Sequence, residues 1–172
     1  PALWVMTFSD HWSITGNDIS KVAASGITHY MQEGIRIGTA SNYNYVANNN
    51  VHDIEGDGRA INTDVDSSFN LIQFNKVNNV AIGFNDQMSG WGNVWQYNQV
   101  SNFRNLGFAI RLKDNTLAAP SMNSSAHSIV LRCNRALQPV GKAKSLGIGG
   151  VMKARASGNN FTTSWVSPPA VG

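Results

Sequence analysis

Cysteine and charge are both scarce in this sequence of 172 residues. The single cysteine, Cys133, excludes an intrachain disulfide and any zinc site built from several cysteines. Charged residues make up only 13% of the chain, whereas hydrophobic residues make up 42%. Polar character must therefore come from Asn, Ser, Thr and Gly, which is typical of β-rich, turn-rich proteins rather than of charged helical bundles.

Long hydrophobic runs are also missing. No apolar stretch reaches the roughly 18 residues of a membrane-spanning helix, so no membrane span is expected. The chain begins abruptly with PALWVMTF, which has no signal-peptide pattern and reads like a mature or excised piece of something longer. The net charge of +3 is mild and the basic residues are scattered, so nucleic acid is not an expected partner. The length predicts one domain.

An asparagine recurs in six similar segments, and apolar residues stand three positions before it and two positions after it. The six are Asn17, Asn49, Asn75, Asn98, Asn134 and Asn159. Their intervals of 32, 26, 23, 36 and 25 residues indicate a repeating coil with loops of variable length. Asparagine suits the bend of each coil, because it tolerates a left-handed backbone and its amide can bond to the same amide one coil away.

A second apolar strand, with glycine nearby, precedes most of these asparagine segments. GIRIG begins at Gly34, VAIGFND at Val80 and GFAIRLKD at Gly107. Their alternation has the period of two that is typical of strands, and no stretch shows sustained helical periodicity. A unit of three short strands cannot bury its apolar face alone, so neighbouring units must stack, which predicts a parallel solenoid.

These patterns resemble the right-handed parallel β-helix of pectate-lyase type, which is found in polysaccharide lyases, glycoside hydrolases and phage tailspikes. The resemblance implies an all-β, single-stranded solenoid of about six coils with an asparagine ladder. We expect the β-helix over residues 1–165 and an irregular tail over 166–172. The glycine-associated strands would form the first sheet, the segments leading to each asparagine the second, and the residues after it the third.

In the family resembled, the polysaccharide lies along the first sheet. Inward-pointing residues set the strand phase, and we take these to include Ile35, Ile61, Ile82, Phe84 and Phe108. The same phase predicts solvent-facing side chains at Arg36, Asn62, Asp64, Asn85, Arg111 and Lys113. Two polar loops flank this face, one with His52 and Arg59 and the other with Asp86 and Trp91. Together they offer the carboxylates, bases and aromatic ring that a sugar site needs.

From these positions we predict the substrate contacts as Arg36, His52, Arg59, Asn62, Asn85 and Trp91, and the catalytic residues as Asp64, Asp86, Arg111 and Lys113. In a lyase, Arg111 or Lys113 would remove the proton beside a uronate carboxylate, and Asp64 and Asp86 would bind calcium. In a glycoside hydrolase, the two aspartates would flank the scissile bond. NTD at 62–64 and RLK at 111–113 resemble polygalacturonase signatures, but the paired aspartates and the Gly-His-Gly of that family are absent.

The same residues also allow structural interpretations. Asp and Asn in turns often bond to the backbone, and exposed cations such as Arg111 and Lys113 can discourage edge pairing. Two functions therefore stay open. One is an enzyme, a lyase or a glycoside hydrolase, that cleaves a polysaccharide; the other is a non-catalytic glycan-binding β-helix such as a tailspike segment or adhesin. A homotrimer or the remainder of a longer chain would shield the coil ends, and we expect an extracellular or virion-surface location.

Overall fold

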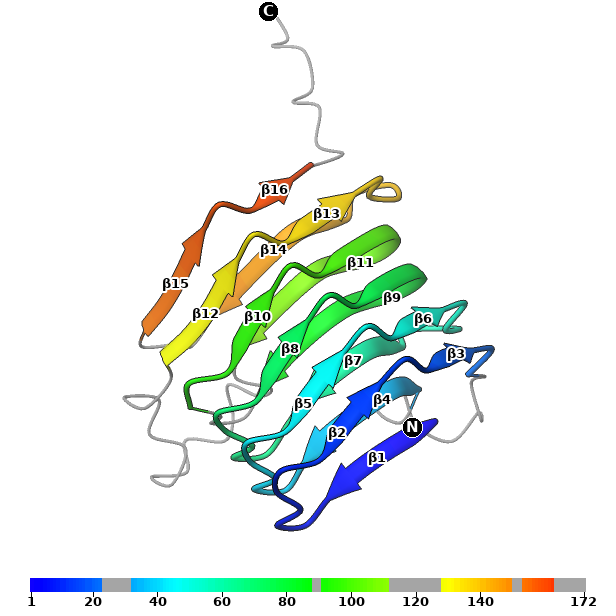
Figure 1. The fold of residues 1–172 in the computed structure, drawn as a ribbon. Coiled ribbons are helices and arrows are strands. Elements are labelled where there is room, and N and C mark those ends of the chain that lie inside the picture. Colours follow the sequence, from blue (N-terminus) through cyan, green and yellow to red (C-terminus); the bar gives the residue numbers. More distant parts are fainter. Residues whose placement is uncertain (23–31, 88–90, 112–127, 150–152, 163–172) are drawn as a thin grey trace, which may run out of the picture.

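The chain winds into a stack of six coils, each built from three strand segments (Figure 1). The structure, a computed structural model, describes residues 1–22, 32–87, 91–111, 128–149 and 153–162. Across these ranges the secondary structure consists of 16 strands and contains no helix, hence none that could cross a bilayer. The all-β fold predicted from the sequence is thereby confirmed. The predicted tail, residues 166–172, lies outside the described residues.

The strands fall into three rows that follow the three sides of the coil. The first row comprises β1 (Leu3–Met6), β4 (Glu33–Gly38), β7 (Arg59–Thr63), the end of β9 (Lys76–Gln87), the end of β11 (Gln99–Arg111) and β14 (Lys144–Gly149). The second row comprises β2 (Ser13–Thr15), β5 (Tyr45–Ala47), β8 (Leu71–Gln73), β10 (Val94–Gln96), β12 (Ser128–Arg132) and β15 (Lys153–Ser157). The third row comprises β3 (Asp18–Ser20), β6 (Asn50–His52), the start of β9, the start of β11, β13 (Arg135–Leu137) and β16 (Asn160–Phe161).

All strand pairs are parallel and connect equivalent segments of successive coils. The second row forms a separate 6-stranded sheet. The first and third rows join into one 10-stranded sheet, because β9 and β11 run without a break from the third side of one coil to the first side of the next. The sequence predicted three separate sheets, whereas the structure fuses two of them at this corner.

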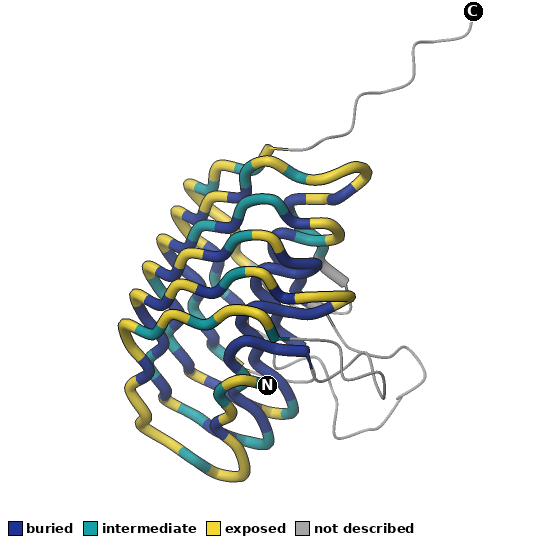
Figure 2. Tube along the Cα trace, turned by 90° about the vertical axis from the view of Figure 1, so that its right-hand side faces the viewer, coloured by how far each residue is buried: buried dark blue, intermediate teal, exposed yellow. Residues whose placement is uncertain are grey.

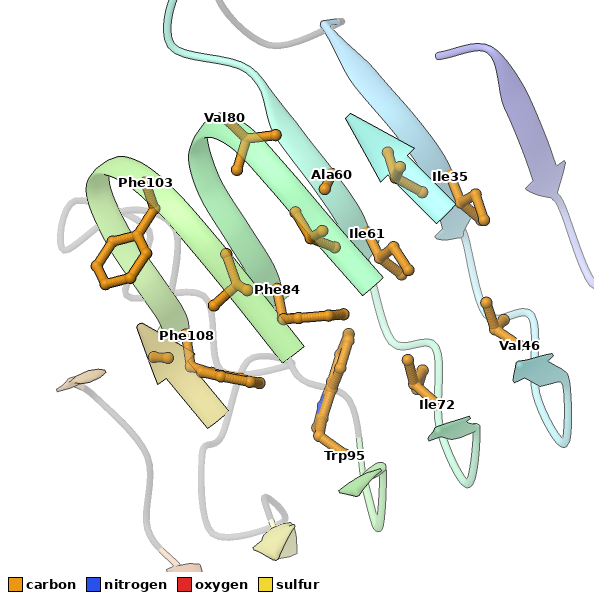
Figure 3. Close-up of a cluster of buried hydrophobic side chains, with 14 of the residues drawn as sticks. Ile35, Val46, Ala60, Ile61, Ile72, Val80, Phe84, Trp95, Phe103 and Phe108 are labelled. Atoms are coloured by element: carbon orange, nitrogen blue, oxygen red, sulfur yellow. The ribbon is translucent and has the colours of Figure 1, made fainter. Parts of the chain in front are cut away.

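The core fills the interior of the coil with the residues that flank each asparagine. Val46, Ile72 and Trp95, three positions before their asparagines, are fully buried, as is Val100, two positions after Asn98. Figure 3 shows the ring of Trp95 directed at Phe84, and the two ring centroids lie 6.0 Å apart in an edge-on arrangement. Both flanking offsets predicted from the sequence therefore point inward, as a closely packed interior requires.

Glycine is required where β9 and β11 turn into the first row. A Cβ on Gly83 would lie 2.6 Å from the carbonyl oxygen of Gly107 and 2.7 Å from Cγ2 of Val100. No side chain fits at that distance, so the corner can close only around a glycine. The glycines noted in the sequence therefore mark the places where the third row packs directly beneath the first.

The six predicted asparagines form an unbroken ladder along the stack. In each step, the side-chain amide nitrogen donates to the amide oxygen of the asparagine in the next coil, at 2.8–3.2 Å. The backbone N–H of the lower asparagine donates to the same oxygen. The ladder holds the coils in register although the loops between them differ in length.

The left-handed backbone, however, lies one residue before each ladder asparagine. Asn48, Phe74, Tyr97 and Cys133 have φ between 54° and 56°, and Gly16 and Gly158 occupy the equivalent positions. The prediction that the asparagine itself adopts this conformation was therefore wrong. The side-chain amide is used for the ladder, while its neighbour makes the bend, and two of these neighbours, Phe74 and Tyr97, stack their exposed rings 5.1 Å apart.

A second, shorter ladder occupies the corner between the first and second rows. Asn44 donates to Asn70 at 3.0 Å, and Asn70 donates to Asn93 at 3.1 Å. Each of these asparagines precedes a member of the first ladder by five residues, a constant offset that was available in the sequence and that sequence analysis did not use. Buried amides therefore hold the central coils together at two corners, whereas the sequence predicted only one such corner.

Replacing Asn98 with Ala should lower the free energy of unfolding by about 3–5 kcal/mol, because this side chain takes part in four hydrogen bonds and its loss leaves buried groups without partners. Urea denaturation followed by circular dichroism would measure the change. The exposed Asn105 provides the control, since Asn105→Ala should change stability by no more than about 0.5 kcal/mol. Equal stability of the two variants would contradict the role assigned to the ladder.

Candidate functional site

The outer face of the first row carries most of the polar residues predicted to contact a substrate. Arg36, Asn62 and Asn85 lie level with one another in successive coils. Trp4 lies level with them in the first coil, and Ala109 continues the row above Asn85. We call the polar residues of this face the outer strip, comprising Glu33, Arg36, Arg59, Asn62, Asp64, Asn85 and Gln87.

The outer strip is buried rather than exposed, apart from the partly buried Arg36. Asn62 and Asn85 are 0% exposed, Asp64 is 1% exposed and Gln87 is 2% exposed. Figure 2 shows the buried stretches of successive coils lying above one another. The expectation that these side chains face solvent was wrong, although their position on the outer face of the first row was right. Their polar groups must consequently find partners within the protein or in a bound molecule.

Glu33 is the centre of an ionic network at the lower end of the strip. Its carboxylate accepts hydrogen bonds from Arg36 Nη1 at 3.2 Å, from Arg59 Nη1 at 3.1 Å and from Asn62 Nδ2 at 2.8 Å. The Glu33 side chain is fully buried, so these donors replace the water it gives up on folding. Sequence analysis missed Glu33, because it stands three residues before Arg36 and strict alternation would place the two on opposite faces.

Arg36 connects this network to Asp64 and to an aromatic ring. Its Nη2 donates to Asp64 Oδ2 at 2.5 Å, and its guanidinium carbon lies 5.3 Å from the ring centroid of Trp4. A planar guanidinium can pair with two carboxylates and stack on an indole at the same time, which a lysine could not do equally well. The predicted contact residues Arg36, Asn62 and Arg59 are thus brought together, with Asp64 beside them.

Asp86 lies on the other side of the sheet from Asp64. It is level with Thr63, and its Oδ2 accepts hydrogen bonds from Asn93 Nδ2 at 3.0 Å and from Trp95 Nε1 at 2.9 Å, both inside the coil. Burial raises the pKa of Asp86 to about 6, against the opposing effect of these two hydrogen bonds. The two aspartates predicted as a catalytic pair therefore belong to neighbouring coils but face opposite sides of the strand.

The two aspartates do not fit a shared calcium ion. The Asp64 carboxylate is held by Arg36 and by the backbone N–H of Val65, and the Asp86 carboxylate accepts from two interior donors. Calcium requires several oxygen ligands that converge on one point, whereas these point to opposite faces. Within the described ranges, no group of three or more His, Cys, Asp or Glu side chains is arranged to hold a metal ion.

The remaining predicted residues lie apart from the outer strip or outside the described residues. His52 belongs to the third row, where its ring nitrogens lie 2.8 Å from Asp53 and 3.2 Å from Asp18, and the hydrogen bond with Asp53 raises the pKa of His52. Trp91 lies at the corner of the second ladder and is half exposed. The backbone of Arg111 is level with Gln87. Lys113 lies outside the described residues.

Replacing Glu33 with Gln should destabilise the protein by about 3 kcal/mol or more, because Arg36 and Arg59 then remain buried with less opposing charge. Thermal and urea unfolding would measure the loss. Glu55 is exposed, so Glu55→Gln serves as the matched control and should be nearly neutral. If both variants unfolded at the same urea concentration as the wild type, the network would not contribute to stability.

Asp86 should make the protein more stable at mildly acidic pH. Because the folded-state pKa of about 6 lies above the ordinary value of 3.8, the folded state favours the protonated form. The stability that this group contributes is complete below about pH 4 and is lost as the pH rises through 6. Asp86→Asn keeps an oxygen that can accept from Asn93 and Trp95 but does not titrate.

The difference in unfolding free energy between Asp86→Asn and the wild type should therefore change by up to about 3 kcal/mol between pH 4 and pH 7. Urea denaturation at a series of pH values would measure it. His52 titrates equally in both proteins, so its contribution cancels. A constant difference across this range would show that Asp86 keeps an ordinary pKa.

Comparison with known proteins supports the fold. No protein-family model matches the sequence, and no curated protein matches it. Among solved structures, the chain is similar to a mutant of AlgG, a periplasmic alginate epimerase, with a TM-score of 0.57 and 15% sequence identity. The similarity covers 92% of this chain but 42% of that one, so the chain spans less than half the length of its structural neighbour. The similarity at this low identity is one of fold, and it confirms the predicted right-handed parallel β-helix.

Proposed function

We propose that this protein binds an acidic polysaccharide along the outer face of its first row of strands and acts on it by proton abstraction. The observation that carries the proposal is the outer strip itself, a buried column of ionic and amide groups that crosses successive coils in register. A linear polymer lying along the stack would meet these groups one coil after another, about 4.8 Å apart. An enzyme of this kind would be extracellular or periplasmic.

Proton abstraction is favoured over hydrolysis by the positions of the aspartates. A glycoside hydrolase needs two carboxyl groups on either side of one bond. Asp64 faces outward, whereas Asp86 faces the interior and is bonded to Trp95. Removal of a proton beside a uronate carboxylate needs instead a base and a cation that stabilises the developing charge. Arg111 and Lys113 are the proposed bases.

The structural neighbour supports the choice of an acidic polymer. Its name describes a protein that acts on alginate, which is a polymer of uronic acids. Epimerisation and elimination of a uronate both begin with loss of the proton beside the carboxylate, so one set of residues suits either reaction. The neighbour shares the fold only, and the substrate is our proposal for this chain.

A non-catalytic glycan-binding protein is the second candidate. Its supporting observation is that both carboxylates of the strip are already engaged, Glu33 by two arginines and Asp64 by one. Groups held in this way position a ligand well but are poor proton donors or acceptors. A tailspike segment or adhesin would need only such binding groups.

Incubation with alginate, polygalacturonate and neutral dextran would separate these functions. Elimination should produce the ultraviolet absorbance of an unsaturated uronate, and epimerisation should change the uronate signals in proton NMR spectra. Arg111→Ala or Lys113→Ala should lower the rate about a hundredfold or more if that residue is the base. Lys76, exposed in the third row, provides the control, and Lys76→Ala should retain the full rate.

A rise in reducing ends without an unsaturated product would indicate hydrolysis and contradict the proposed reaction. Binding of the acidic polymers without any product would support the second candidate. Failure to bind either acidic polymer would exclude both functions along this face.

A further inference from the structure

Gln87 is a buried amide, and no described residue is a partner for either of its polar atoms. It ends β9 on the outer face of the first row, level with Arg111, and it is 2% exposed. Within the part of the chain that the structure describes, neither its Nε2 nor its Oε1 has a hydrogen-bond partner, and the Oδ1 of Asn85, two residues earlier on the same face, also lacks one. The Asn85 amide nitrogen is occupied, since it donates to Asn62 Oδ1 at 2.5 Å.

Such an arrangement is unfavourable for the protein alone. Buried amides in native structures nearly always have a hydrogen-bond partner, and each exception requires an explanation such as a functional role or a bound molecule. Turning the Gln87 amide over would not help, because neither end has a partner among the described residues. The buried Gln96 amide in the second row shows the usual solution, since it donates to Gln73 and accepts from Arg132.

The residues next to this amide pair are small. The row that contains Arg36, Asn62 and Asn85 continues with Ala109 and then Gly147. The outer side of the row thus changes from long polar side chains to a methyl group and a hydrogen atom just beyond Asn85. Among the described residues of this row, the long polar side chains therefore end at Asn85.

We propose that Asn85 and Gln87 form a subsite that binds the hydroxyl groups of one sugar residue, an inference that rests on the proposed function. The unused groups are one donor, Gln87 Nε2, and two acceptors, Gln87 Oε1 and Asn85 Oδ1. A sugar hydroxyl both donates and accepts, so neighbouring hydroxyls can satisfy all three. A carboxylate only accepts and would leave both acceptors unpaired. The uronate carboxylate therefore belongs elsewhere on the polymer, and this subsite selects for the hydroxylated edge.

The test compares Gln87→Met with Gln73→Met. Gln73 lies in the second row, where its amide donates to Tyr45 at 2.8 Å and accepts from Gln96 at 2.5 Å. Isothermal titration calorimetry with alginate and polygalacturonate would measure affinity, and urea denaturation would measure stability. Gln87→Met should bind at least about tenfold more weakly while unfolding at the same or a higher urea concentration, because an unpaired buried amide is removed. Gln73→Met should show the reverse, with lower stability and unchanged affinity.

Three results would overturn the proposal, and they are distinguishable. If the wild type binds and Gln87→Met binds equally well, the subsite is wrong and the proposed function stands. If Gln87→Met loses stability together with affinity, the amide has a partner in the fold and its role is structural. If the wild type binds neither polymer, the proposed function fails and the subsite fails with it.

Discussion

The amide-to-amide hydrogen bonds between successive coils fix which residues of this protein lie above one another. Each ladder asparagine in the central coils bonds to the coil above and to the coil below, as Asn75 does with Asn98 and Asn49. The segments between ladder positions vary from 23 to 36 residues, yet the strands stay in register. Parallel strands alone would tolerate a slip along the chain, whereas a buried amide that loses its partner is costly.

Register also decides the chemistry of the outer face. Because Asn62 is level with Asn85 and Thr63 with Asp86, Asp64 points outward and Asp86 inward. Asp86 is level with Thr63, one position before Asp64 in the register. The Asp64 carboxylate therefore pairs with Arg36 on the outer face, whereas the Asp86 carboxylate accepts from Asn93 of the second ladder. This difference argues against hydrolysis by that pair and makes Asp86 part of the internal framework.

The outer strip combines groups that satisfy one another with groups that do not. Glu33 has three donors, and the buried charges there are balanced within the protein. Gln87 has no partner in the described ranges, although it is buried almost as deeply. Proteins accept such a cost mainly where function requires it, since polar groups left free in the fold are available to a ligand. The lower coils thus provide a rigid support, and the amide pair above them provides unused hydrogen-bonding capacity.

The sequence by itself determined the coil repeat, the six ladder asparagines and the apolar positions around them, because these depend on spacing that recurs locally along the chain. The phase of the first row was mostly right, but Ile82 lies level with Arg59 and outside the core cluster. Only the tertiary structure decided that the outer strip is buried, that Glu33 joins it and that Asp86 faces inward. Burial and pairing depend on residues from other coils, and a strand irregularity of one residue reverses the face of every side chain beyond it.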